Sequence, residues 1–221
     1  MIISNATRRD FIRNIIVSAA AVPLLANCKG NAFAETGPSS DILERLKKMA
    51  VQDSNGAWSG AVSAPANVSW KTTLSTETDK GEPMEISGTV FQSDSKTPAA
   101  NTLIYLYHTD FEGYYGRTKD VHRHGKYRGW MLTDKTGRYS FRSIKPAPYP
   151  VNRFAAHIHM TLTTEKMRED WVDSILFEGD RLISQNERSQ AGLKGGFNPI
   201  VSFEKGKDGL LRATRDMKLM A

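Results

Sequence analysis

Short apolar runs separated by polar turns fill the chain from residue 84 onward. Residues 102–107, Thr-Leu-Ile-Tyr-Leu-Tyr, are rich in the β-branched and aromatic residues that favour strands. By the same criteria we expect strands over residues 84–92, 102–107, 129–133, 138–143, 155–163, 199–203 and 210–219. Helical spacing predicts a helix over residues 41–49 and short helices over 165–172 and 180–190. Many short strands with few helices predict an all-β fold, a β-sandwich with long loops.

Two turn sequences predict how some of these strands pair. Asp134-Lys-Thr-Gly137 ends in glycine and joins two strand candidates, so we expect a hairpin between residues 129–133 and 138–143. A second turn, Lys205-Gly-Lys-Asp-Gly209, predicts a hairpin between 199–203 and 210–219. The preceding residues 51–82 are rich in Ser, Thr and Gly, and we expect loops and one or two edge strands there.

The first thirty-four residues have the order of an export signal. Arg8 and Arg9 precede an apolar stretch over 15–26, and Ala32-Phe-Ala34 follows as a small-residue cleavage site. The paired arginines resemble the twin-arginine signal, which predicts export to the periplasm and cleavage after Ala34. The apolar stretch is too short for a stable membrane span. Acylation at Cys28, which would make the protein a lipoprotein, is the alternative.

We divide the remaining chain into a helix and linker at 35–82 and one domain at 83–221. Its charge and cysteine content limit the partners and cross-links that we expect. The net charge is +6, and removal of residues 1–34 leaves 26 basic and 23 acidic residues, a net charge of +3. No basic run is interleaved with aromatic residues, so nucleic acid is not an expected partner. The chain has 1 cysteine, which excludes an internal disulfide. The oligomeric state stays open.

One histidine pair has the spacing of a metal site. In a strand, residues two apart point to the same face, so His157 and His159 can reach one point. Just before them, residues 145–150 read Lys-Pro-Ala-Pro-Tyr-Pro, a stiff loop that carries Tyr149. A second loop carries Tyr114 and Tyr115 between glycines. Phenolate and imidazole together suit a hard cation, and ferric iron fits this set best. A hydrolytic zinc site on the same histidines is a weaker alternative.

Other polar pairs have simpler explanations. His122-Arg123-His124 is a second His-x-His sequence, which we interpret as a solvated loop at the mouth of a pocket, able to touch an acidic substrate group. His108 and Asp110 have the spacing of a His/carboxylate iron site, but Asp110 more simply begins a turn after a strand.

Residues 133–150, Thr-Asp-Lys-Thr-Gly-Arg-Tyr-Ser-Phe-Arg-Ser-Ile-Lys-Pro-Ala-Pro-Tyr-Pro, resemble a signature of the intradiol ring-cleavage dioxygenases, the family of the protocatechuate and catechol dioxygenases. Ala156-His-Ile-His159 is similar to the family's Pro-Ala-His-Ile-His, and Leu176-Phe-Glu-Gly-Asp180 resembles a downstream segment. The resemblance runs from about residue 84 to 219. It implies a sandwich of the prealbumin or immunoglobulin type.

The resemblance also implies a site and a reaction. The family holds ferric iron with two tyrosines and two histidines, which map to Tyr115, Tyr149, His157 and His159, with Tyr114 as the alternative first tyrosine. The expected partners are an aromatic diol and dioxygen, and the ring is cleaved between the hydroxylated carbons. Tyr149 is expected to act in catalysis.

Two family residues are replaced in this chain. A family arginine falls on Phe154, so Arg153 is the expected catalytic substitute, and a family glutamine falls near Ser174. These departures motivate the alternative function, a non-catalytic exported binding module.

Overall fold

The computed structural model describes residues 40–50, 60–116, 122–151 and 154–220. The described residues belong to one unit, which spans Glu35–Ala221. The predicted signal segment and Arg153 lie outside the described residues. Within the described ranges, neither the length nor the apolar character of any helix is sufficient to cross a membrane.

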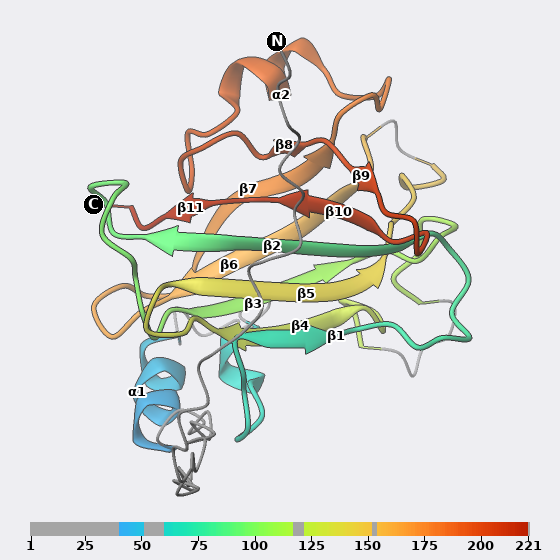
Figure 1. Ribbon diagram of the computed structural model, residues 1–221. Helices are drawn as coiled ribbons and strands as arrows, with labels where there is room; N and C mark the ends of the chain where they lie inside the picture. The colour runs from blue at the N-terminus through green and yellow to red at the C-terminus, as the bar shows by residue number, and fades with distance from the viewer. Residues whose placement is uncertain (1–39, 51–59, 117–121, 152–153, 221) are drawn as a thin grey trace, which may run out of the picture. The chain divides into compact units, whose positions relative to one another are not determined.

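Two β-sheets stack face to face (Figure 1). The first sheet has the order β1 (Lys71–Thr73), β5 (Arg138–Ile144), β2 (Pro83–Phe91), β10 (Leu211–Thr214) and β9 (Glu204–Lys205), and β11 (Met217–Lys218) also pairs with β2. The second sheet has the order β4 (Arg128–Leu132), β3 (Leu103–His108), β6 (His157–Thr163), β7 (Asp170–Phe177) and β8 (Ile200–Val201). The predicted β-sandwich is therefore confirmed.

The main core lies between the sheets and is built largely by alternate residues of the strands. Its largest cluster includes Met84, Ile86, Phe141, Ile104, Leu106, Ile158 and Met160. Complete burial of such a side chain contributes about 1.5–3 kcal/mol. Because side chains alternate along a strand, the residues between these on β3 and β6 face the outside of the second sheet.

Part of that outer face is covered by the N-terminal elements. The predicted helix is confirmed as α1 (Ser40–Ala50), and a single 3-10 turn, η1 (Ala61–Ser63), follows. Leu43 and Leu46 of α1 form a second cluster with Leu103 and Leu132 of the second sheet. The buried Glu169 carboxylate accepts hydrogen bonds from the backbone nitrogens of Gly60 (3.0 Å) and Ala61 (3.2 Å), which fixes this cover beside β7.

The hairpin predicted around residues 134–137 is wrong. The turn itself forms, because Asp134 Oδ1 accepts hydrogen bonds from the backbone nitrogens of Thr136 and Arg138. However, β4 pairs with β3 and β5 pairs with β2, so the turn carries the chain from one sheet to the other. The hairpin predicted around 205–209 forms between β9 and β10, whereas β8 pairs with β7 in the second sheet.

Among the predicted helices, the one over residues 165–172 is wrong, because residues 170–177 form β7. The helix predicted over 180–190 is shorter, α2 (Gln185–Gln190), and begins at a capping box of Ser184 and Glu187. Of the loop segment 51–82, the described part contains one edge strand, β1, as predicted. Figure 1 shows α1 and α2 at opposite ends of the sandwich.

Candidate functional site

The outer face of the second sheet carries the predicted histidine pair. β6 runs antiparallel to β3, with His159 opposite Tyr107. Ile158 is buried in the core, so its neighbours His157 and His159 both face outward. Their Nε2 atoms lie 3.1 Å apart and their rings are nearly perpendicular. Strand geometry thus brings the pair together, as the spacing predicted.

Two loops at the end of the sheet bring the tyrosines to this pair. Tyr149 lies between β5 and β6 on the proline-rich loop, and Tyr115 lies between β3 and β4. The loops touch at Gly113, where an added Cβ would lie 2.0 Å from the carbonyl oxygen of Pro148. Gly113 also has φ +88°, which L side chains rarely adopt. A side chain at this position would push the two loops apart.

The four side chains converge on one point. The phenol oxygens of Tyr115 and Tyr149 are 2.7 Å apart. The Tyr149 oxygen is 3.1 Å from His157 Nε2 and 3.4 Å from His159 Nε2. By contrast, Tyr114 is 40% exposed. The structure therefore places Tyr115 rather than Tyr114 beside the other three residues.

The contacts behind the histidines direct lone pairs toward the cluster. His157 Nδ1 lies 2.7 Å from the carbonyl oxygen of Ala155, which can only accept, so Nδ1 carries the proton and Nε2 is left as an acceptor. His159 Nδ1 lies 3.3 Å from Ser174 Oγ. In the same tautomer, the two Nε2 atoms present lone pairs to each other at 3.1 Å. A cation between them would remove this repulsion.

The distances also fit a shared metal ion. Ligand atoms about 2 Å from one cation lie roughly 3 Å from one another, and the four distances within the cluster are 2.7, 3.1, 3.1 and 3.4 Å. Within the described ranges, no group of three or more His, Cys, Asp or Glu residues is arranged to hold a metal. The donor set that can hold one therefore consists of two phenols and two imidazoles.

Burial favours the neutral forms of His159 and Tyr115 when no cation is near. It is the largest cause that lowers the pKa of His159, to about 3, followed by the charges of His157 and His124. Burial also raises the pKa of Tyr115, and the hydrogen bond with Tyr149 adds to the effect. A phenolate at Tyr115 is therefore strongly disfavoured unless a positive charge compensates it.

Two hollows flank the cluster. The first, which we call the basic hollow, has a volume of about 550 Å³ and is lined by Tyr107, Tyr115, Arg123, His124, Tyr149, His159 and Trp171. The second, the acidic hollow, has a volume of about 400 Å³ and shares Tyr149 and His159 with the first. Asp173 and Glu187 also line it. Both volumes are within the range of small-molecule sites.

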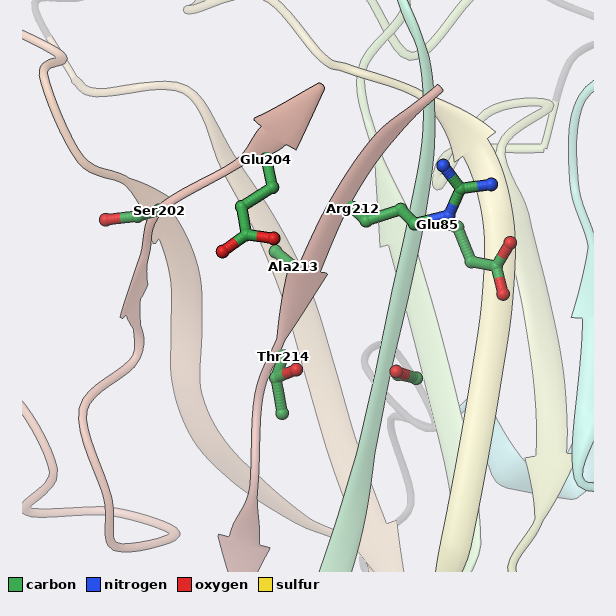
Figure 2. Close-up of a pocket in the computed structure, with 7 residues that line it drawn as sticks. Glu85, Ser202, Glu204, Arg212, Ala213 and Thr214 are labelled. Carbon is green, nitrogen blue, oxygen red and sulfur yellow. The ribbon is translucent and has the colours of Figure 1, made fainter. Parts of the chain in front are cut away.

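A third hollow lies on the other sheet and has a different character. It has a volume of about 450 Å³ and is lined by Glu85, Arg212 and other residues of β2 and β10. Arg212 points across β2 toward Glu85 (Figure 2). Arg212 is paired with Asp208 at 2.6 Å, and Glu85 with Arg142 at 2.8 Å. With Arg212 and Glu85 in ion pairs and no histidine or tyrosine in its lining, this hollow resembles an ordinary solvated sheet surface.

Sequence reasoning missed several residues of the basic hollow. His124 was interpreted as part of a solvated loop, but it is 4% exposed and stacks on Tyr107 with 3.9 Å between ring centroids. The interpretation holds for His122, which is exposed. The alternation of β3 offered a signal, since Tyr105 and Tyr107 share the outward face with the histidine pair. Nothing local in the sequence predicts the burial of His124.

The remaining candidates do not join the cluster. His108 is completely buried, with Nδ1 2.7 Å from the carbonyl oxygen of Thr109 and Nε2 2.8 Å from Ser143 Oγ. Asp110 accepts hydrogen bonds from the backbone of Glu112 and Tyr114, as expected for a turn. Phe154, the residue onto which the resemblance places a family arginine, is 55% exposed, with its ring 6.4 Å from that of Tyr149.

Comparisons with known proteins identify relatives of this chain. A family profile described as "Dioxygenase" matches residues 57–201. The chain is 30% identical over 129 residues to a chlorocatechol 1,2-dioxygenase of Pseudomonas sp. (strain P51), which covers 47% of this chain and 51% of the relative. It is 30% identical over 132 residues to a protocatechuate 3,4-dioxygenase beta chain of Burkholderia cepacia, covering 55% and 56%. These alignments span about half the length of the relatives.

Solved structures share the fold. A catechol 1,2-dioxygenase from Acinetobacter sp. ADP1 has a TM-score of 0.55 at 17% identity, covering 69% of this chain and 57% of that chain. A dioxygenase domain from Streptomyces sp. SirexAA-E, part of a fusion with a carbohydrate-binding protein, has a TM-score of 0.52 at 19% identity, covering 77% and 97%. The profile covers more than half of the chain, and the chain belongs to the intradiol dioxygenase family.

Proposed function

We propose that this protein is a ferric, non-haem dioxygenase that cleaves a catechol-type ring between its two hydroxylated carbons. Both atoms of dioxygen enter the product, so one carbon–carbon bond is lost and a ring-opened dicarboxylic acid is formed. The observation that carries the proposal is the convergence of two phenol oxygens and two imidazole nitrogens within 2.7–3.4 Å in a chain of this family.

The donor set supports ferric iron as the metal. Tyr115, Tyr149, His157 and His159 would hold it, because phenolates are hard anionic ligands and imidazole also suits iron. Bound ferric iron supplies Lewis-acid chemistry that makes a chelated aromatic diol reactive toward dioxygen. A zinc site would more often contain thiolate or additional histidine ligands.

The protein's own residues have separate tasks in this proposal. The Ala155 carbonyl and the Ser174 hydroxyl orient His157 and His159 through their Nδ1 atoms. Tyr149 Oη has the three other donor atoms around it and lines both hollows. It is therefore the atom best placed to take up a proton from an incoming diol hydroxyl. Arg153 remains our proposed substitute for the family arginine beside the substrate ring.

Oxygen uptake by the iron-loaded protein tests this function. We expect equimolar consumption of oxygen and catechol, and Tyr149→Phe should lower the rate at least about 100-fold, because it removes a ligand and a proton acceptor. Tyr114→Phe is the matched control, since its side chain is exposed, and should change the rate less than about twofold.

Other outcomes would support the other functions. Bound iron with no uptake from any catechol would contradict the enzyme and favour a non-catalytic binding module. Hydrolytic activity that requires zinc would favour the hydrolase instead.

We also propose that the protein is exported to the periplasm through its paired arginines and cleaved after Ala34. Mass spectrometry of the periplasmic protein tests this directly. A mature chain that begins at Glu35 is expected, whereas a lipid-modified chain that begins at Cys28 would establish the lipoprotein alternative.

A further inference from the structure

Among the described residues that line the basic hollow, one buried side-chain nitrogen has no hydrogen-bond partner. His124 is 4% exposed, and its Nε2 atom is buried without a hydrogen-bond partner among the described residues. A buried polar nitrogen without a partner is unusual in a folded protein and calls for an explanation. His124 lines the same hollow as Tyr149 and His159, so a bound molecule is a candidate partner.

The other ring nitrogen decides what this partner must be. His124 Nδ1 lies 2.7 Å from the buried hydroxyl of Tyr105. In the described part of the chain this hydroxyl has no second acceptor for its hydrogen, so the hydrogen is satisfied only if Tyr105 donates to Nδ1. Burial lowers the pKa of His124 to about 4, so the ring is neutral at neutral pH. Nε2 therefore carries the single ring proton and is a donor that requires an acceptor.

The charges of the two hollows indicate which acceptor fits. Arg123 is the one ionised side chain among the described residues that line the basic hollow. The acidic hollow instead contains Asp173 and Glu187, which would repel an anion. An anionic oxygen would satisfy the His124 donor and lie beside the Arg123 charge.

The spacing suits a substituted aromatic ring. The ring of Tyr107 is close to both histidines, with centroid distances of 3.9 Å to His124 and 4.7 Å to His159. The ring centroids of His124 and His159 are therefore separated by no more than the sum of these two distances. One substituted benzene ring can bridge such a span. Tyr107 and Trp171 provide aromatic walls for such a ring.

We propose that the basic hollow binds a carboxylate substituent on the aromatic diol, with His124 Nε2 as the hydrogen-bond donor and Arg123 as the counter-charge. Arg123 and His124 are then specificity-determining residues. The placement of the diol end rests on the proposed function, whereas recognition of the carboxylate can be measured without turnover.

Calorimetric titration with 4-hydroxybenzoate and with phenol tests the proposal. The two ligands differ by the carboxylate, and neither is a vicinal diol that ring cleavage could consume. With the full mature chain, both iron-loaded and iron-free, 4-hydroxybenzoate should bind at least about tenfold more tightly than phenol. Arg123→Gln and His124→Phe should each reduce this preference to less than about threefold. The phenylalanine can keep the stacking on Tyr107.

Two further variants complete the design. Tyr105→Phe removes the contact that fixes the His124 tautomer and should weaken the preference for 4-hydroxybenzoate without changing the affinity for phenol. Arg212→Gln makes the same change of charge on the other sheet (Figure 2) and should leave the preference unchanged. Because Arg123 is exposed, its substitution should not unfold the protein, even if the His124 variant does.

The results separate the two proposals. Equal affinity for the two ligands, binding of neither, or a preference that survives Arg123→Gln would overturn the carboxylate subsite. Failure of the proposed function would appear separately, as absent oxygen uptake with catechol. A carboxylate preference that depends on Arg123 would support the subsite even in that case.

Discussion

The chain contains two His-x-His pairs of identical spacing, and the structure places them differently. His157 and His159 lie on a central strand, and their Nε2 atoms approach to 3.1 Å. His122 and His124 lie on a loop, where His122 is exposed and His124 is buried against Tyr107. A spacing of two residues thus predicts convergence only where the backbone is extended and paired.

The difference also separates two chemical tasks. The strand pair presents two nitrogen lone pairs to one point, which suits a cation. In the loop pair, only His124 faces the hollow, and its contact with Tyr105 makes Nε2 a donor, which suits an anion. The hydrogen-bond partner of one ring nitrogen, a carbonyl for His157 and a hydroxyl for His124, decides which nitrogen carries the proton, and thereby what the ring can bind.

The largest expected difference between the two pairs is the effect of single histidine substitutions on iron affinity. His157→Gln or His159→Gln should lower iron affinity by more than about 100-fold, since even the loss of an outer partner of a ligand typically costs about 10–100-fold. His122→Gln should leave iron affinity unchanged. Iron content after dialysis against a chelator measures all three. Equal iron retention by His159→Gln and His122→Gln would contradict the assignment of the strand pair.

His108, a buried histidine outside both pairs, tests how burial affects the pH dependence of stability. Burial lowers the pKa of His108 to about 4. The unfolded chain takes up a proton below about pH 6.5, but the folded protein does so only near the lower value, so the free energy of unfolding should decrease as the pH falls through this window. The loss should approach about 3 kcal/mol.

Urea unfolding of the iron-free protein across this pH range measures the effect. His108→Gln should remove that part of the pH dependence, whereas His122→Gln should retain it because this ring is exposed. An identical pH dependence in the wild type and His108→Gln would show that His108 does not contribute.

The smallest expected effect concerns the loops that place Tyr115 and Tyr149 beside His157 and His159. Gly113 and Gly179 both have φ +88°, but only at Gly113 would an added Cβ meet other atoms. Gly179→Ala should therefore cost only backbone strain, about 1 kcal/mol. Gly113→Ala should cost about 2 kcal/mol more and weaken iron binding, because Pro148 must move.

Thermal unfolding and iron titration of the two glycine variants measure this difference. Equal behaviour in both assays would show that the contact between the loops does not position Tyr115 and Tyr149.

The sequence predicted the parts of this molecule that depend on local patterns. Strand alternation predicted the convergence of His157 and His159, and apolar runs predicted the strands from which the sandwich is built. The turn chemistry of Asp134 was also recognised, but a local turn does not specify which sheet each flanking strand joins. Pairing depends on long-range packing.

β7 was missed for a related reason. Val172 and Ile175 are three residues apart, a helical spacing, yet both face the core. An irregular register makes this possible, because Ile158 and Met160 of β6 pair with Ile175 and Val172. This irregularity lies opposite His159, and strand bulges commonly occur beside functional sites. The burial of His124 likewise depends on Tyr107, which is distant from it in the sequence.

The visible absorption spectrum of the purified protein, with iron quantified in the same sample, tests the central claim most directly. A tyrosinate-to-ferric charge-transfer band is expected in the wild type and in Tyr114→Phe, and it should be lost or strongly shifted in Tyr149→Phe. A protein that remains colourless after loading with ferric iron, or a band unchanged in Tyr149→Phe, would contradict the proposed phenolate–iron site.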